Sequence, residues 1–301
     1  MELGMVGLGR MGGNMARRLL RAGHRVVGFD PGEQARAALE ADGGTAVASL
    51  EALAEALASP RAVWLMVPAG RITDESVDAL AGLLSRGDTV VDGGNSNYKD
   101  SMRHADELRA AGIDFVDCGT SGGVWGLEQG YSLMVGGDKA PVDRLRPVFE
   151  ALAPAPDKGW GHVGPVGSGH YVKMVHNGIE YGMMQAYAEG FSILQHKEAF
   201  ALDLHQVAQV WRHGSVVRSW LLDLTADALR RNPTMEGISP WVADSGEGRW
   251  TLQEAIDLDV PAPVIALSLI SRLRSRDDDS FADKLLAAMR NEFGGHAIRK
   301  E

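Results

Sequence analysis

The N-terminal stretch MELGMVGLGRMGGNMARRLLRAG, residues 1–23, decides the fold of the first part of the chain. Its opening residues are mostly apolar and predict a short strand, and residues 13–23 predict a helix. Between them, Gly7-Leu8-Gly9-Arg10-Met11-Gly12 matches the pattern GxGxxG, which alone is a weak signal. Its place between a strand and a helix strengthens it, because main-chain N–H groups at the start of a helix can hold a pyrophosphate. The stretch therefore predicts a Rossmann-type unit that binds a dinucleotide.

The second predicted strand, HRVVGFD, ends at Asp30, about where the dinucleotide fingerprint expects an acid that bonds the ribose 2′-OH. A carboxylate in that place would repel the 2′-phosphate of NADP. No arginine follows Asp30 directly, although Arg36 lies within a turn or two. We therefore expect NAD as the cofactor, and the alternative is a glycine turn without a ligand.

Up to about residue 165, short apolar runs alternate with amphipathic stretches, which predicts a parallel, doubly wound sheet. The later runs are RAVWLMVP, DTVVDGG, IDFVDCG and YSLMVGG, which begin at residues 61, 88, 113 and 131. The glycine-rich segment GHVGPVGSGH, residues 161–170, marks the expected domain junction, and helical periodicity dominates after it. The predicted fold class is α/β. A Rossmann domain over residues 1–165 is followed by an all-helical domain over residues 166–301, for substrate binding and oligomerisation.

Bulk composition limits the function classes. The 301 residues carry a formal net charge of −10 and a pI near 5.4, which argues against nucleic-acid and anionic-membrane partners. An anionic substrate would need a local basic pocket. Cys118 is the only cysteine, so the chain has no internal disulfide and no Cys-rich metal site, and we expect this residue to be buried in a strand. We find neither a signal-type segment nor an apolar run of membrane-spanning length, so a cytoplasmic enzyme or binding protein is expected.

The segments that follow the later predicted strands lie at the edge where doubly wound sheets bind ligands. Val67 and Pro68 follow one strand, and Asn95 follows the next. Asn95 is the side chain expected to point into the crevice, and the alternative for Asn95 and Ser96 is capping of the helix that follows. The segment Cys118-Gly119-Thr120-Ser121-Gly122-Gly123 follows a third strand, and its free N–H groups and the Ser121 hydroxyl offer donors to an anion such as a carboxylate. The alternative is another glycine turn without a ligand.

The segment KMVHNGIEYG, residues 173–182, gathers polar groups at helical spacing. Lys173, Asn177, Glu180 and Tyr181 fall at i, i+4, i+7 and i+8 and share one helical face. Apolar residues take most of the remaining surface of that helix. A solvated face and a stripe of titratable groups facing a cleft are both compatible with this pattern.

Together, GLGRMGGNMA, DGGNSNYKDS, DCGTSGG and KMVHNGIEYG resemble the decarboxylating 6-phosphogluconate dehydrogenase family in its short-chain form. The resemblance spans nearly the whole chain. GxGxxG and SGG with a downstream lysine would fit the wider β-hydroxyacid dehydrogenase superfamily. HNGIEYG, GRWT of residues 248–251 and the C-terminal FGGH are much narrower signals.

The resemblance implies a mechanism. Lys173 matches the family's catalytic lysine, which takes the proton of the C3 hydroxyl while hydride leaves to the nicotinamide. This needs an uncharged amine, which burial and neighbouring cations favour. The protonated lysine then polarises the C3 carbonyl while CO2 departs, giving an enediol. Glu180 matches the acid that protonates C1, and desolvation favours the neutral carboxyl that this step needs. No metal is implied.

The resemblance also implies a set of substrate ligands. Asn177, His176, Asn95 and Ser121-Gly122-Gly123 would contact hydroxyls and the carboxylate, and Tyr181 and Arg272 match phosphate ligands. Arg290 and His296 have the spacing of a tail motif that enters the active site of the neighbouring subunit, which implies a homo-oligomer, at least a dimer.

The chain departs from the family pattern in two places. Ser245 stands where the long forms carry a lysine, and Arg249 either compensates for it or is structural. The chain also lacks the second helical half of the long forms. Two alternatives remain: a non-decarboxylating dehydrogenase of a small β-hydroxyacid such as 3-hydroxyisobutyrate, and a non-catalytic dinucleotide-binding sensor. Glu180 and the phosphate-binding arginines separate the first from the predicted activity, and Lys173 with Glu180 argues against the second.

Overall fold

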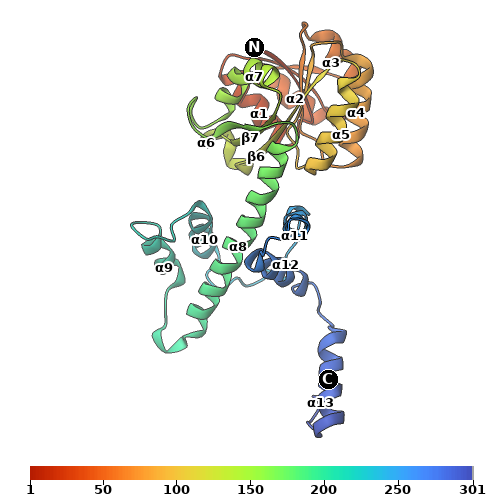
Figure 1. The fold of residues 1–301 in the computed structure, drawn as a ribbon. Coiled ribbons are helices and arrows are strands. Elements are labelled where there is room, and N and C mark those ends of the chain that lie inside the picture. The colour runs from red at the N-terminus through yellow and green to blue at the C-terminus, as the bar shows by residue number, and fades with distance from the viewer. Residues whose placement is uncertain (300–301) are drawn as a thin grey trace. The chain divides into compact units, whose positions relative to one another are not determined.

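The computed structural model describes residues 1–299. The chain divides into two compact units, Met1–His176 and Asn177–Glu301. The boundary falls inside one long helix, α8 (Ser168–His196), which contributes residues to both units (Figure 1).

The first unit is a doubly wound sheet with helices on both faces (Figure 1). Over the described residues its strands form one 8-stranded sheet in the order β3-β2-β1-β4-β5-β6-β7-β8. The elements follow the chain as β1 (Glu2–Val6), α1 (Arg10–Arg21), β2 (Arg25–Phe29), α2 (Glu33–Ala41), β3 (Thr45–Val47), α3 (Leu50–Ala56), β4 (Ala62–Leu65), α4 (Arg71–Leu83), β5 (Thr89–Asp92), α5 (Tyr98–Arg109), β6 (Asp114–Ser121), a 3-10 turn (Gly123–Trp125), α6 (Gly126–Gln129), β7 (Ser132–Gly137), α7 (Lys139–Leu152) and β8 (Trp160–Gly164). This arrangement confirms the predicted Rossmann-type fold.

The sheet differs from the expected all-parallel pattern at one pair. β6 and β7 are antiparallel, with Val116 opposite Gly137, because only the short 3-10 turn and α6 join them and no crossover helix turns the chain around. β8 then pairs parallel to β7 after the crossover through α7. β8 overlaps the start of the glycine-rich segment, residues 161–170, that the sequence predicted as a junction. Its glycines hide the usual strand pattern, and the pairing with β7 decides its conformation.

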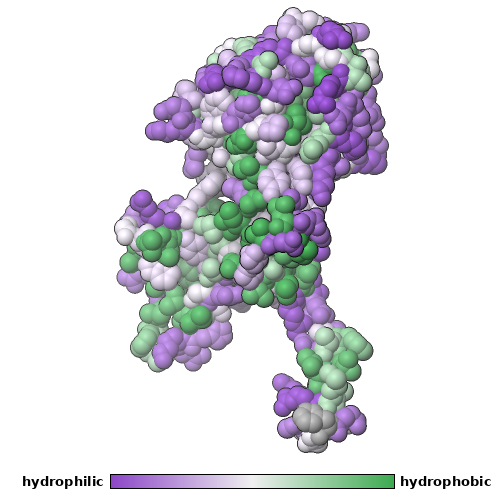
Figure 2. Space-filling view, in the orientation of Figure 1, coloured by the Kyte–Doolittle hydropathy of each residue, from purple (hydrophilic) through white to green (hydrophobic). Residues whose placement is uncertain are grey.

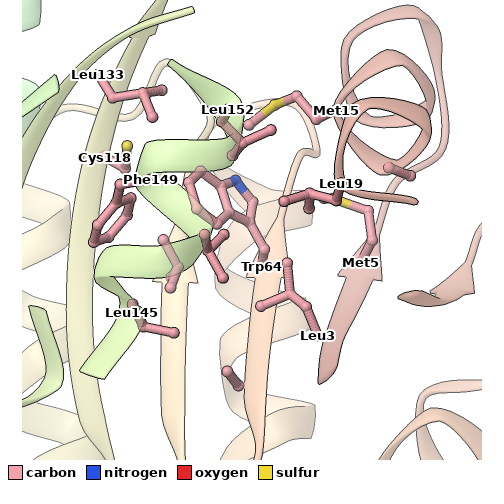
Figure 3. Close-up of a cluster of buried hydrophobic side chains, with 14 of the residues drawn as sticks. Leu3, Met5, Met15, Leu19, Trp64, Cys118, Leu133, Leu145, Phe149 and Leu152 are labelled. Atoms are coloured by element: carbon pink, nitrogen blue, oxygen red, sulfur yellow. The ribbon is translucent and has the colours of Figure 1, made fainter. Parts of the chain in front are cut away.

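Two hydrophobic cores lie on the two faces of the sheet, because neighbouring residues of each strand point to opposite sides. On β4, Trp64 packs into the core beneath α1 and α7, whereas Val63 packs into the core beneath α3, α4 and α5. In the first core Trp64 meets Phe149 edge to face at 5.9 Å between ring centroids (Figure 3). Both strand faces are apolar, as expected for a parallel sheet covered by helices on each side.

The second unit is helical over its described residues. After α8 it contains a 3-10 turn (Glu198–Phe200), α9 (Leu204–Trp211), α10 (Trp220–Arg231), α11 (Glu247–Asp257), α12 (Pro263–Arg274) and α13 (Phe281–Gly294). Phe191 of α8 shares a small core with α9 and α10. Two glycines of α8 allow close packing of other helices: a Cβ on Gly178 would lie 2.7 Å from Thr251 Cγ2 of α11, and one on Gly182 would lie 3.1 Å from Val264 Cγ1 of α12.

α8 buries part of its polar stripe, and Glu180 stays half-buried. Lys173 and Asn177 are only 7% and 8% exposed, whereas Ile179 is 53% exposed, and Met183 and Met184 are exposed as well. Figure 2 shows further hydrophobic side chains at the surface of the helical unit. Burial of Lys173 and Asn177 argues against a fully solvated face, and whether the stripe faces a cleft stays a prediction. None of the helices in residues 1–299 combines the length and the apolar character that a membrane span needs.

Candidate active site

The three glycines of the fingerprint have three different surroundings. Gly7 has a φ of +87°, and a Cβ there would lie 2.5 Å from the Met66 carbonyl oxygen, so only glycine allows this turn after β1. A Cβ on Gly12 would lie 1.9 Å from the Gly7 carbonyl oxygen, so this glycine lets α1 start close to the strand. Above Gly9 a Cβ would meet nothing within 4 Å, so a ligand can approach the main chain there. These are the roles that the dinucleotide fingerprint gives its glycines.

The start of α1 is open to an anion. Gly9 is the N-cap residue, no side chain caps the helix, and its first turn carries no acidic residue. The first N–H groups of a helix have no partner inside it and favour negative charge. A pocket of about 340 Å³ adjoins this point and is lined in part by Gly9, Arg10, Asn14 and Gln34. The residues present therefore fit a pyrophosphate.

Asp30 connects the end of β2 to the fingerprint. Its Oδ2 accepts a hydrogen bond from the Leu8 N–H at 2.8 Å, and its Oδ1 accepts one from the Gly32 N–H at 2.8 Å. A carboxylate offers about four lone-pair sites, so both oxygens can still accept from a ribose hydroxyl. Arg36 donates to the main-chain carbonyls of Asp30 and Pro31 at 2.6 and 3.1 Å, so a cation also stands at this turn.

The loops after β4 and β5 pack against each other. A Cβ on Gly94 would lie 3.0 Å from the Val67 carbonyl oxygen, and the Pro68 carbonyl accepts from the Thr73 hydroxyl at 3.0 Å. Asn95 follows β5 with an exposed side chain. The cap of α5 is Asn97, whose side chain accepts from the Lys99 N–H at 2.9 Å, so neither Asn95 nor Ser96 is the N-cap residue.

Lys173 lies directly on β6. A Cβ on Gly119 would be 2.3 Å from the Lys173 Cβ, so the glycine is what lets α8 come this close to the strand. The sequence placed Cys118 to Gly123 after a strand, but β6 continues through Ser121, and only Gly122 and Gly123 leave it, with φ of +135° and +53°. Ser121, Gly122 and Gly123 thus begin two residues beyond the glycine against which Lys173 packs.

Cys118 is fully buried in β6, as expected for a strand residue. Burial raises the pKa of its thiol far above the usual range, and the nearby Asp117 and Asp92 carboxylates act in the same direction. A thiol kept protonated in this way is no nucleophile.

The other residues of the stripe share α8 with Lys173. Asn177 is buried one turn after Lys173, and His176 and Glu180 are half-buried. Helical geometry brings Lys173, Asn177 and Glu180 onto one side of α8. Among residues 1–299, no group of three or more His, Cys, Asp or Glu side chains is placed to hold a metal ion.

In the helical unit, Tyr181 and Arg272 are in contact. The Arg272 guanidinium carbon lies 3.5 Å from the centroid of the Tyr181 ring, and its Nη1 donates to the Ala243 carbonyl at 2.8 Å. The Ser245 N–H donates to the Tyr181 hydroxyl at 3.3 Å. The structure thus brings together two predicted phosphate ligands and the residue that replaces the family's lysine.

Arg249 is engaged in an ion pair. Its Nε and Nη2 donate to the two oxygens of Asp244 at 3.0 and 3.1 Å, and Arg276 Nη2 donates to the same carboxylate at 2.9 Å. Hydrogen bonding to Arg249, followed by that to Arg276, holds the pKa of Asp244 below its usual range. This supports the structural interpretation of Arg249. Sequence reasoning missed Arg276 and Asp244, although Arg276 stands four residues after Arg272.

The predicted tail residues are exposed. Arg290 lies on α13, and His296 lies beyond its end, where its carbonyl accepts from Asn291 Nδ2 at 2.8 Å.

Comparison with known proteins gives consistent matches over the chain. The family model for the NAD binding domain of 6-phosphogluconate dehydrogenase matches residues 2–164, and that for the 6-phosphogluconate dehydrogenase C-terminal domain matches residues 169–294. A Bacillus subtilis protein named putative 6-phosphogluconate dehydrogenase YqeC is 44% identical over 301 residues, covering 100% of both chains. The NAD(+)-dependent, decarboxylating 6-phosphogluconate dehydrogenase of Haloferax volcanii is 47% identical, over 100% of this chain and 99% of its own.

Among solved structures, Plasmodium falciparum 6-phosphogluconate dehydrogenase aligns with a TM-score of 0.84 and 28% identity. The alignment covers 100% of this chain and 66% of the Plasmodium chain, which was studied with NADP+ and with 6-phosphogluconate. Both halves of the sequence therefore match the same enzyme, and the chain belongs to the 6-phosphogluconate dehydrogenase family.

Proposed function

We propose that this chain catalyses the oxidative decarboxylation of 6-phosphogluconate to ribulose 5-phosphate and CO2, with NAD as the oxidant. The observation that carries the proposal is the buried Lys173, packed on Gly119 beside the Ser121-Gly122-Gly123 segment. A buried amine next to a glycine segment suits a base that acts on a bound hydroxy acid. The full-length relatives with this activity support the same assignment.

The fingerprint and its neighbours would hold the cofactor. The uncapped start of α1 and the open side of Gly9 suit the pyrophosphate, and Asp30 suits the ribose hydroxyls. Val67, Pro68 and Asn95 follow the next two strands, where the nicotinamide half is expected in this fold. When bound, NAD supplies the acceptor for the hydride that leaves C3.

Proton transfers would be made by the chain's own residues. Uncharged Lys173 takes the proton of the C3 hydroxyl as the C3–H bond breaks, which leaves a ketone at C3 and an ammonium at Lys173. That ammonium donates to the ketone oxygen while the bond between C1 and C2 breaks. CO2 leaves, and the bonding pair forms the enediol. Glu180 then donates a proton to the carbon that becomes C1 of the product, while Lys173 takes back the hydroxyl proton on the former C3, which restores the ketone. Asn177 orients the substrate between the two groups.

Substrate recognition would divide between the ends of the sugar acid. Asn95, His176 and the Ser121-Gly122-Gly123 segment are assigned to hydroxyls and the carboxylate. The guanidinium of Arg272 and the Tyr181 hydroxyl are assigned to the phosphate. Arg249 is not assigned to it, because its Nε and Nη2 already donate to the two oxygens of Asp244.

We further propose that residues 166–301 form the substrate and oligomerisation domain of a homo-oligomer. Large hydrophobic side chains are exposed on α12 and α13, including Leu267, Ile270, Phe281 and Leu286. Burial of such side chains drives stable association. The exposed Arg290 and His296 would then reach the active site of a neighbouring subunit.

The test is parallel measurement of NADH absorbance and CO2 release with 6-phosphogluconate, gluconate and 3-hydroxyisobutyrate. We expect equimolar NADH and CO2 with 6-phosphogluconate and much slower turnover of the other two acids. NADH without CO2, or preferred turnover of 3-hydroxyisobutyrate, would favour the non-decarboxylating alternative. Binding of NAD without turnover of any of the three would favour the sensor.

A further inference from the structure

Two fully buried aspartates lie side by side in the sheet. Asp92 ends β5, Asp117 lies in β6, and the two are register partners in the parallel pairing of these strands. Both are 0% exposed. Register partners on neighbouring strands point to the same face of a sheet. Both carboxylates contribute to the raised pKa of the Cys118 thiol. Buried carboxylates are costly unless hydrogen bonds satisfy them, so their partners indicate what they do.

Asp117 binds the main chain at the start of α8. Its Oδ1 accepts from the Gly167 N–H at 2.7 Å, and its Oδ2 accepts from the His170 N–H at 2.8 Å. The first N–H groups of a helix lack partners within it, so Asp117 caps α8 from a different element. A negative charge at this end also interacts favourably with the helix dipole.

The first turn of α8 packs closely on the sheet. A Cβ on Gly169 would lie 2.4 Å from the Met134 carbonyl oxygen and 2.5 Å from that of Asp117. One turn later, Lys173 rests on Gly119. The side chain that caps the helix and the glycine that receives the lysine are thus two residues apart on one strand. Asp117 therefore holds the start of the helix that carries the lysine.

Asp92 acts in the same way on the neighbouring loop. Its Oδ1 accepts from the Gly94 N–H at 3.0 Å, and its Oδ2 accepts from the Ser96 hydroxyl at 2.6 Å. Asn95 stands between these two contacts. The pair of aspartates thus fixes two segments that bear predicted site residues.

We propose that Asp117, with Asp92 beside it, is a positioning residue for the chemical step, because it holds the amine of Lys173 where the C3 hydroxyl binds. The proposal rests on the proposed function. Proton transfer requires the base within hydrogen-bonding reach of the proton. A shift of about 1 Å in a catalytic group can cost on the order of 100-fold in rate. Loss of the Asp117 contacts should therefore lower kcat. It should not change cofactor binding, because the dinucleotide fingerprint is unaltered.

The variant Asp117→Asn tests this, because it keeps the shape of the side chain but replaces one acceptor with an NH2 group that faces an N–H donor. We expect kcat with 6-phosphogluconate to fall by about 10- to 100-fold, with KM for NAD unchanged. The matched control is Asp88→Asn. Asp88 is 1% exposed and accepts from the Arg61 and Ser85 N–H groups at 2.6 and 2.9 Å. The Asp88→Asn variant should lose thermal stability and keep the wild-type kcat.

Unchanged kcat in Asp117→Asn, or an equal loss in Asp88→Asn, would overturn the proposal. Hydrogen exchange of the wild-type protein covers the case in which the variant does not fold. If Asp117 caps α8, the main-chain amides of Gly167 and His170 exchange slowly in the wild-type protein. Exchange as fast as in exposed loops would show that Asp117 does not cap the helix, and would overturn the proposal. Because exchange needs no substrate, it also separates this proposal from the proposed function: slow exchange without 6-phosphogluconate turnover would refute the activity and retain the cap.

Discussion

Replacement of Asp30 by asparagine should change the choice between NAD and NADP. The carboxylate stands at the end of β2, half-buried, with one oxygen on the Leu8 N–H and the other on the Gly32 N–H. The variant removes the negative charge but keeps a similar shape. Its single carbonyl oxygen can serve one of the two N–H groups, so the turn loosens as well.

The size of the effect follows from charge and distance. Two unit charges about 4 Å apart at an effective dielectric constant near 20 interact by about 4 kcal/mol, which corresponds to roughly 1000-fold. Solvent and salt screen part of this at a half-buried site, so we expect wild-type preference for NAD in kcat/KM on the order of 100-fold. Loss of one hydrogen bond to a charged group costs about 1.5–3 kcal/mol, so Asp30→Asn should lower kcat/KM for NAD by roughly 10- to 100-fold.

The assay is kcat/KM for NAD and for NADP at fixed 6-phosphogluconate, in wild type and variant. NADP should gain as NAD loses, because Arg36 remains at the turn without an opposing carboxylate. Asp223→Asn is the control: it removes the same charge from α10, where the half-buried Asp223 pairs with Arg212. A wild type that prefers NADP would refute the argument. So would an NAD-to-NADP ratio that Asp30→Asn leaves unchanged, or that Asp223→Asn shifts equally.

Three further predictions concern the substrate. Lys173→Met should lower kcat by about 100- to 10,000-fold, because it removes the general base. NADH should still bind to this variant and quench its protein fluorescence. Near-normal turnover would show that Lys173 takes no part in the mechanism. Arg272→Ala should raise KM for 6-phosphogluconate by about 10- to 100-fold through loss of a charged hydrogen bond, and an unchanged KM would place the phosphate elsewhere. Truncation before Arg290 should raise KM for 6-phosphogluconate sharply, and retention of the full-length KM would leave the shared tail without support.

Much of the fold could be predicted because it rests on local patterns. The strand, fingerprint and helix of residues 1–23 and the apolar runs that follow are confirmed by β1, α1 and the order of the sheet. The strand β7 was predicted but its antiparallel direction was not, and the glycine-rich β8 was missed, because strand direction and edge pairing depend on the neighbouring strand. The end of β6 was placed too early, because its final residues resemble a glycine turn.

The site was predictable in its residue types and much less so in its contacts. Helical spacing put Lys173, Asn177 and Glu180 on one side of α8, but spacing alone allowed that side to face water or protein. The sequence also left two roles open for Arg249, and only the ion pair with Asp244 favours one of them. Asp117 drew no attention because its partners, Gly167 and His170, are main-chain groups about fifty residues away in the chain.

The sequence by itself determined the fold class, the dinucleotide fingerprint and the family. These depend on the periodicity of short segments and on motifs whose members are close neighbours in the chain. Only the tertiary structure decided which side of α8 is buried, that a glycine of β6 receives Lys173, and that an aspartate of the same strand caps the helix. Burial and hydrogen bonding between distant segments depend on how those segments pack, and no local pattern encodes that packing.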